Sequence, residues 1–339
     1  RIASRWKGRN SKHGPNGQPW DFPRSMPEYH AASLCAQSAL LLQGELPSCD
    51  YTDHDLYFIG KKPIDTPHGP AYTADTVRDI SVGNWQMRSI GEELVAPVEH
   101  HLSSVIHPSN VGWIPGRIIN QPVYRTNCKV HRATLERRRY ACLLLDFHKA
   151  FPSVLLEALW LVLALQGWHH QWILALRTLH SQMRQHIRLA GKAYPGPPRN
   201  NGLWTGNGSS TVLLLCLLDV LARAVYAHPA FSEEDPDCSS LDGFADDYAV
   251  FFAYLHHARV FKGFLFCFAS WSGVGPSLHK SALVLPPYDQ DHASWLRLLW
   301  PELPIVLHSD TLGVLVGAYI TSEALFAKAL AGMESAVHM

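Results

Sequence analysis

The stretch Gly243-Phe244-Ala245-Asp246-Asp247-Tyr248-Ala249-Val250-Phe251-Phe252 decides the fold. Its two adjacent aspartates stand between apolar and aromatic runs that favour β-strands, and aspartate tolerates the geometry of a tight turn. The segment therefore predicts a β-hairpin whose turn carries Asp246 and Asp247. Neighbouring carboxylates in an otherwise apolar hairpin repel each other, so the pair requires a compensating cation.

A second apolar run ends in a carboxylate 100 positions earlier, in Cys142-Leu143-Leu144-Leu145-Asp146-Phe147-His148-Lys149-Ala150-Phe151. A lone carboxylate at a strand end is usually a surface or cap residue. Hard divalent ions, however, prefer oxygen ligands, and a third carboxylate would complete a site for two metal ions. We therefore expect Asp146, Asp246 and Asp247 to bind two Mg²⁺ ions, or Mn²⁺, and to serve phosphoryl transfer.

The composition indicates a globular protein. With 339 residues, 47% hydrophobic and 17% charged, the chain can bury a large core and is expected to form one large domain or two intimate subdomains. The seven cysteines include no Cys-x-x-Cys pair, which argues against a zinc ribbon or a disulfide framework and fits a reducing compartment.

No membrane segment or secretory signal is expected. The apolar stretches 154–165 and 211–227 are interrupted by charged residues, and the basic amino terminus has no apolar core. The first residue is Arg1 rather than Met, which suggests a piece of a longer protein.

The formal net charge is zero, so total charge alone does not indicate a nucleic-acid binder. Basic residues nevertheless gather in the segments 1–12 and 125–139. Such runs are consistent either with a solvated helix face or with part of a template or primer track.

The two aspartate segments resemble the catalytic core of reverse transcriptases, most closely the non-LTR (LINE-like) retrotransposon type. The first block of that family reads Asp-x-x-x-Ala-Phe, matched here by Asp146, Ala150 and Phe151. Its active-site hairpin reads aromatic-x-Asp-Asp, matched by the segment 244–247.

The resemblance covers about residues 11–318 and implies an α+β right-hand polymerase fold, in which a palm with an antiparallel sheet and helices adjoins fingers and a partial thumb. Residues 1–55 are then an amino-terminal extension and the start of the fingers, residues 56–318 the fingers and palm, and residues 319–339 the start of the thumb or a connecting segment. Apolar spacing further predicts helices over 27–42, 84–106 and 152–166.

The segments 56–63 and 76–82 look like the paired strands of the fingers. The family carries cations there, because the incoming triphosphate must be neutralised and aimed. By resemblance we assign this substrate-binding role to Lys62 and Arg78, with Lys61 as the alternative lysine.

The segment 202–211 stands where the family has a Gln-Gly-x-x-x-Ser-Pro block, and Gly206 and Ser210 match its substrate-binding positions. Thr205 replaces the expected glutamine, and Asp79 replaces a proline that the family usually has in its fingers. Threonine reaches less far than glutamine, so this departure bears on nucleotide selection.

Further roles follow from the resemblance. Phe151 would be the aromatic gate that excludes a sugar 2′-hydroxyl, with a core phenylalanine as the alternative. Arg117, in a Gly-x-x-Pro-Gly-Arg block, would face the template, unless it is a surface residue of an ordinary turn. Lys280 would donate a proton to the leaving pyrophosphate, or else be a solvated turn lysine. Leu312 and Gly313 would grip the primer.

The function implied is that of an RNA-directed DNA polymerase, whose partners are an RNA template, a DNA primer and deoxynucleoside triphosphates. An RNA-dependent RNA polymerase shares the same palm, but Phe151 as a gate and Ala245 before the aspartates favour deoxynucleotides. A decayed retroelement copy that folds and binds nucleic acid without catalysis is the other alternative, and Thr205 is compatible with it.

Overall fold

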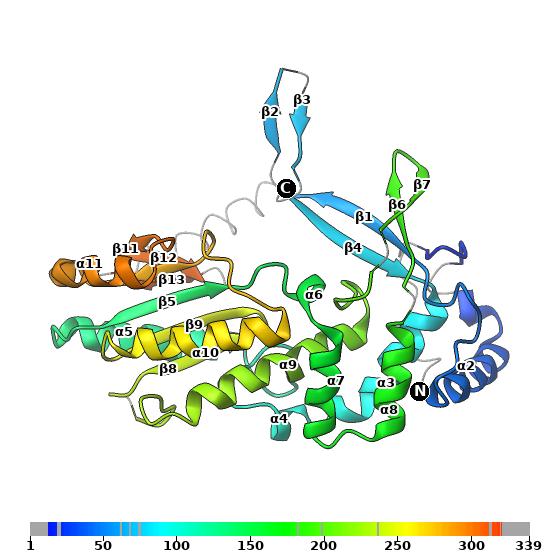
Figure 1. The fold of residues 1–339 in the computed structure, drawn as a ribbon, viewed down its shortest axis with the longest axis horizontal. Helices are drawn as coiled ribbons and strands as arrows, with labels where there is room; N and C mark the ends of the chain where they lie inside the picture. The colour runs from blue at the N-terminus through cyan, green and yellow to red at the C-terminus, as the bar shows by residue number, and fades with distance from the viewer. Residues whose placement is uncertain are drawn as a thin grey trace, which may run out of the picture. The chain divides into compact units, whose positions relative to one another are not determined.

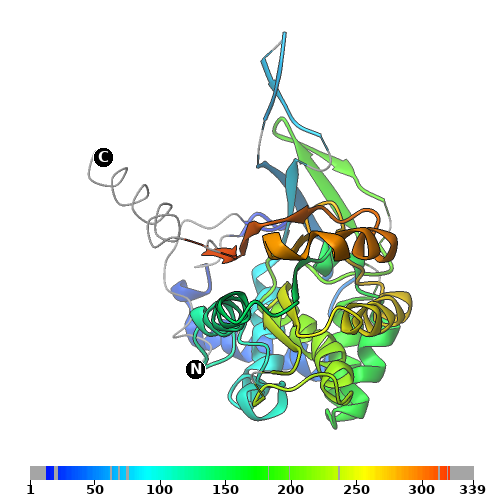
Figure 2. The same ribbon diagram turned by 90° about the vertical axis from the view of Figure 1, so that its left-hand side faces the viewer.

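The computed structural model describes residues 13–18, 22–61, 63–67, 69–73, 76–181, 183–197, 199–235, 237–311, 314–318 and 320. The chain divides into two units (Figures 1 and 2). Unit 1 comprises residues 1–100 and 151–214, and unit 2 comprises residues 101–150 and 215–339. Residues 321–339, which include most of the expected thumb, lie outside the described residues.

Unit 1 contains a four-stranded sheet in the order β4-β1-β6-β7. Its strands are β1 (His54–Gly60), β4 (Val77–Gly83), β6 (Gln185–Leu189) and β7 (Lys192–Pro195). The antiparallel pairing of β1 with β4 confirms the two strands expected in 56–63 and 76–82. A separate small hairpin is formed by β2 (Ile64–Thr66) and β3 (Gly69–Ala71).

The helices of unit 1 are η1 (Phe22–Ser25), α2 (Pro27–Leu42), α3 (Trp85–Glu99), α6 (Ala150–Ser153), α7 (Leu156–Leu165) and α8 (His170–Leu179). Helix α8 contacts α2, α3 and α7. The helix expected over 27–42 is confirmed as α2.

Two expected helices are each split in the structure. The helix expected over 84–106 ends at Glu99, soon after Pro97, which lacks a backbone donor, and resumes as the short α4 (Leu102–Val105). The helix expected over 152–166 is broken between α6 and α7. Its cause is visible in the backbone, because the carbonyls of Phe151 and Val154 accept hydrogen bonds from Leu203 and Gly202 instead of from the next helical turn.

Helix α9 (Gly208–Tyr226) contributes its first seven residues to unit 1 and the remainder to unit 2. By length and composition it is the one helix among the described residues that could cross a bilayer. Most of its side chains are buried inside the protein, as in the central helix of a packed core.

Unit 2 is built on a five-stranded sheet in the order β11-β10-β5-β9-β8. Its strands are β5 (Ala141–Asp146), β8 (Ser240–Phe244), β9 (Asp247–Phe252), β10 (Ala282–Val284) and β11 (Ile305–Val306). Strands β8 and β9 form the expected hairpin, and β5 is the expected strand ending at Asp146. A second hairpin consists of β12 (His308–Thr311) and β13 (Val314–Gly317).

Helices α5 (Asn120–Leu135) and α10 (His257–Ser272) lie on opposite sides of this sheet (Figure 2). On the α5 side, Val130 and Ala133 pack with a stripe of strand residues that includes Cys142 and Phe251. On the other side, the ring of Phe261 from α10 lies 5.8 Å from that of Phe252. The elements η2 (Pro287–Asp289) and α11 (Gln290–Leu299) complete unit 2.

Candidate active site

Two of the expected catalytic aspartates lie at one end of the row of apolar strand residues that packs against α5. The antiparallel register of β5 and β9 pairs Cys142 with Phe251, Leu144 with Ala249 and finally Asp146 with Asp247. Directly opposed residues in such a ladder have Cα atoms about 4.5–5.5 Å apart and side chains on one face. The structure therefore brings Asp146 and Asp247 together, and both are half-buried. The turn itself consists of Ala245 and Asp246, whereas Asp247, also expected in the turn, is the first residue of β9.

The electrostatics of these aspartates favour a cation. The pKa of Asp247 is raised to about 6, mainly by burial and in addition by the negative charges of Asp246 and Asp146. A divalent ion would relieve the same repulsion that otherwise favours a proton. The carboxylates thus fit magnesium chemically, although no three His, Cys, Asp or Glu side chains among the described residues stand as a group that could hold a metal ion.

The turn that carries Lys280 is attached to the backbone of Asp146. The Ser277 N–H donates to the Asp146 carbonyl at 2.7 Å, and the Asp146 N–H donates to Ser281 Oγ at 3.1 Å. Lys280 is exposed at the end of this turn. Its placement follows from the pairing of β10, which starts two residues later, with β5.

A buried side chain that the sequence reasoning missed, Asn110, contacts the hairpin turn. Its Oδ1 accepts from the Ala245 N–H at 3.1 Å, and its Nδ2 donates to the Ala245 carbonyl at 3.2 Å. The same Nδ2 donates to the Tyr248 hydroxyl at 2.9 Å. The nearby Gly112 was the one sequence signal for this contact. A glycine can indicate that the backbone lies close to another segment, but the sequence does not identify that segment.

Arg117 lies in the same loop, and its guanidinium donates to backbone carbonyls of the segment 103–110. Burial lowers the pKa of Arg117. The structure thus places this side chain on its own loop, while its expected contact with a template stays a prediction.

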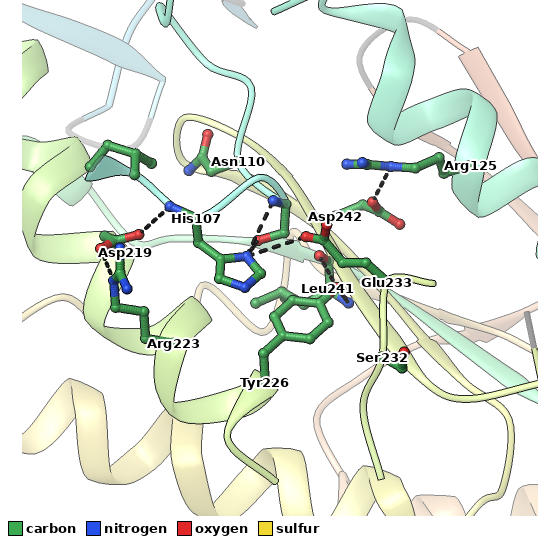
Figure 3. A network of polar contacts seen from close by, with 12 residues as sticks. His107, Asn110, Arg125, Asp219, Arg223, Tyr226, Ser232, Glu233, Leu241 and Asp242 are labelled. Carbon is green, nitrogen blue, oxygen red and sulfur yellow. Dashed lines mark hydrogen bonds and ion pairs between the residues drawn. The ribbon is translucent and has the colours of Figure 1, made fainter. Parts of the chain in front are cut away.

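The loop is also held from the side of α9 (Figure 3). The His107 N–H donates to Asp219 Oδ1 at 2.7 Å, and Asp219 in turn pairs with Arg223 at 2.5 Å. The His107 ring stacks on Tyr226, with ring centroids 4.5 Å apart, and its Nδ1 lies 3.2 Å from Glu233 Oε1. These contacts attach the loop to α9 and to the segment before β8 within unit 2.

Much of the basic run 125–139, which lies in α5 and the segment after it, is engaged in ion pairs with acidic side chains of unit 2. Arg125 Nε lies 2.8 Å from Asp242, whose pKa is raised to about 6 because burial outweighs the attraction of Arg125 and Lys129. Further pairs are Arg132–Glu136, Arg138–Glu136, Arg138–Asp237 and Arg139–Asp289. Next to Asp242 a cavity of about 220 Å³ is lined by both charge signs, so it shows no preference for an anionic ligand.

In unit 1, Thr205 and Asp79, two of the positions that depart from the pattern of the resembled family, contact each other. The Thr205 hydroxyl donates to the Asp79 carbonyl at 3.0 Å, and the Ser81 N–H donates to the Thr205 carbonyl at 3.0 Å. Gly206 has a φ of +108°, and a Cβ there would lie 2.8 Å from the Ser81 carbonyl oxygen. This segment therefore needs glycine for its close approach to β4.

The other expected site residues of unit 1 differ in their exposure. Arg78 is exposed on β4 opposite Ile59, Phe151 is half-buried at the start of α6, and Ser210 is buried in the first turn of α9. Lys61 is exposed. Three expected site residues, Lys62, Leu312 and Gly313, lie outside the described residues.

Comparison with known proteins finds no matching family model. Among solved structures, the chain resembles apo telomerase from Candida tropicalis truncated from its C-terminal domain, with a TM-score of 0.55 and 12% identity over 87% of this chain and 59% of that one. Telomerase from the same organism in complex with a TWJ fragment of telomeric RNA matches with a TM-score of 0.51 and 11% identity, over 78% of this chain and 45% of that one.

The chain has a reverse-transcriptase-like fold. The α+β polymerase architecture expected from the sequence is thereby confirmed. At this identity the likeness establishes the fold alone, and the chain spans less than two thirds of either telomerase chain.

Proposed function

We propose that this chain is an RNA-directed DNA polymerase of the non-LTR retroelement type. The observation that carries the proposal is the pairing of Asp146 with Asp247 at one end of the palm sheet, with Asp246 in the adjoining turn. Carboxylates in this arrangement, on a fold shared with telomerase, suit the transfer of a nucleotidyl group. The RNA template, DNA primer and deoxynucleotides are part of the proposal.

Asp146, Asp246 and Asp247 would hold two Mg²⁺ ions, or Mn²⁺. When bound, these ions would lower the pKa of the primer 3′-hydroxyl and neutralise the triphosphate. The chain's own carboxylates contribute because their mutual repulsion, which adds to burial in raising the pKa of Asp247, favours cation binding over an empty site.

Residues outside the aspartate cluster would orient the substrates. Lys280, on the turn fixed to Asp146, would protonate the departing pyrophosphate. Arg78, with Lys62 or Lys61, would neutralise the triphosphate. Phe151 would exclude a 2′-hydroxyl from the sugar site, and Gly206 and Ser210 would lie beside the nascent pair.

Primer extension on RNA and DNA templates, with deoxynucleotides or ribonucleotides, tests this function. We expect Mg²⁺- or Mn²⁺-dependent addition of deoxynucleotides on RNA, and loss of it in Asp246→Asn/Asp247→Asn. Preferential addition of ribonucleotides would instead indicate an RNA-dependent RNA polymerase. No extension by folded protein with either metal would indicate a decayed copy, in keeping with the replacement of the expected glutamine by Thr205.

A further inference from the structure

The residue before the two aspartates has an unusual backbone conformation. Ala245 has a φ of +58° and is buried. Residues other than glycine rarely adopt this left-handed region, because their Cβ approaches the carbonyl oxygen that follows. The turn that presents Asp246 therefore has to be held in place by its surroundings.

Asn110 provides contacts that define this conformation. Its amide binds both the N–H and the carbonyl of Ala245, at 3.1 and 3.2 Å, so both backbone dihedrals of that residue are restrained. The remaining capacity of the amide goes to the Tyr248 hydroxyl and the Gly112 N–H, each at 2.9 Å. An asparagine amide offers two donors and two acceptor sites, and all four are used here.

The loop around Asn110 is built for this contact. A Cβ at Gly112 would lie 2.2 Å from the Ala245 nitrogen, so only glycine permits the observed approach. Backbone bonds join the loop to β8, with Val111 N–H donating to the Gly243 carbonyl at 2.9 Å. Arg117 joins this loop to α4 by donating to the Ser103 carbonyl of α4 and to the carbonyls of Ile106, His107 and Asn110.

We propose that Asn110, Gly112 and Arg117 form a brace that holds Ala245 in its left-handed conformation and thereby positions the Asp246-Asp247 pair. They are positioning residues, since they act on the aspartates through the backbone of the turn. The purpose of the brace rests on the proposed function, whereas its action on the turn does not.

The test compares Asn110→Ala with Asn110→Ala/Ala245→Gly. Removing the amide should weaken the affinity for Mn²⁺ by roughly 10- to 100-fold, as loss of supporting contacts around metal ligands does. Glycine adopts positive φ without strain, so the second change should recover most of the lost affinity. A loss caused by the unsatisfied Tyr248 hydroxyl and Gly112 N–H, rather than by the conformation of Ala245, would not be rescued.

Thr134→Val is the matched control. Thr134 is buried in unit 2 and bonds the Val130 carbonyl and the Tyr140 hydroxyl, beside the end of β5 opposite to Asp146. This variant loses buried hydrogen bonds but should bind Mn²⁺ like the parent protein. If it lost as much affinity as Asn110→Ala, or if Ala245→Gly rescued nothing, the brace would be rejected.

Hydrogen exchange at the Ala245 amide provides a readout that needs neither metal nor activity. This amide donates to Asn110, so it should exchange faster in Asn110→Ala, and also in Arg117→Met, than in the parent or in Thr134→Val. Unchanged exchange would overturn the proposal. If the parent protein binds Mn²⁺ but does not extend primers, the polymerase function is refuted and the brace is not. If the parent protein binds no Mn²⁺, the hydrogen-exchange rates alone decide whether the brace exists.

Discussion

Alanine at Gly112 should be among the most damaging single-methyl additions in unit 2. The added Cβ would lie 2.2 Å from the Ala245 nitrogen, where ordinary contact begins at 3.4 Å, so one backbone must move by about 1.2 Å. Such a shift breaks the three bonds that join the loop to the hairpin, those of Asn110 to both polar groups of Ala245 and that of Val111 N–H to the Gly243 carbonyl, now 2.9–3.2 Å long. At about 1 kcal/mol for each hydrogen bond, we expect a loss of roughly 3 kcal/mol in the free energy of unfolding.

The same substitution at two other glycines of unit 2 separates steric clash from other effects. Gly116 has a φ of +81° with open space at its Cβ position, so alanine there should cost only the left-handed strain of about 1–2 kcal/mol. Gly263 lies within α10 with nothing near its Cβ position, so alanine should stabilise the helix by about 0.5–1 kcal/mol.

Urea unfolding of the three variants, followed by circular dichroism, measures these differences. The reasoning requires the order Gly263→Ala, Gly116→Ala, Gly112→Ala from most to least stable. A Gly112→Ala protein within about 0.5 kcal/mol of the parent, the usual range of innocuous surface changes, would refute the close approach of this loop to the aspartate turn.

Three further predictions concern unit 1. Phe151→Val should raise ribonucleotide incorporation relative to deoxynucleotide in primer extension; unchanged sugar choice in an active variant contradicts the gate. Thr205→Gln should increase primer extension, because glutamine supplies a longer side-chain amide near the nascent base pair. The substitution gives up the hydrogen bond to the Asp79 carbonyl, worth about 1 kcal/mol. Extension no better than that of the parent protein argues against a role of position 205 in nucleotide selection. Burial lowers the pKa of His54 and His180 to about 4, below the value of 6.5 that applies in the unfolded state. As the pH falls, the unfolded state therefore binds protons before the folded state does. The free energy of unfolding should fall between pH 6.5 and pH 4, by up to roughly 3 kcal/mol per histidine. Urea unfolding should show a smaller fall for His180→Phe, and an equal fall would contradict this origin.

The sequence by itself determined the local elements that carry the site. The apolar and aromatic runs on both sides of Asp246 and Asp247 specified the β8–β9 hairpin, and the apolar run before Asp146 specified β5. These predictions succeeded because strand propensity and turn chemistry act between near neighbours in the chain. The pairing of β1 with β4, in contrast, was expected from the resemblance to the fingers of reverse transcriptases.

Only the tertiary structure decided how these elements are held. Asn110 and Ala245 are 135 residues apart, and no periodicity links an amide in a loop to the backbone of a distant turn. The break between α6 and α7 likewise depends on remote donors, Gly202 and Leu203, that take up the Phe151 and Val154 carbonyls. Local propensity cannot predict these hydrogen bonds, because a buried polar group pairs with a partner that only the tertiary structure places next to it.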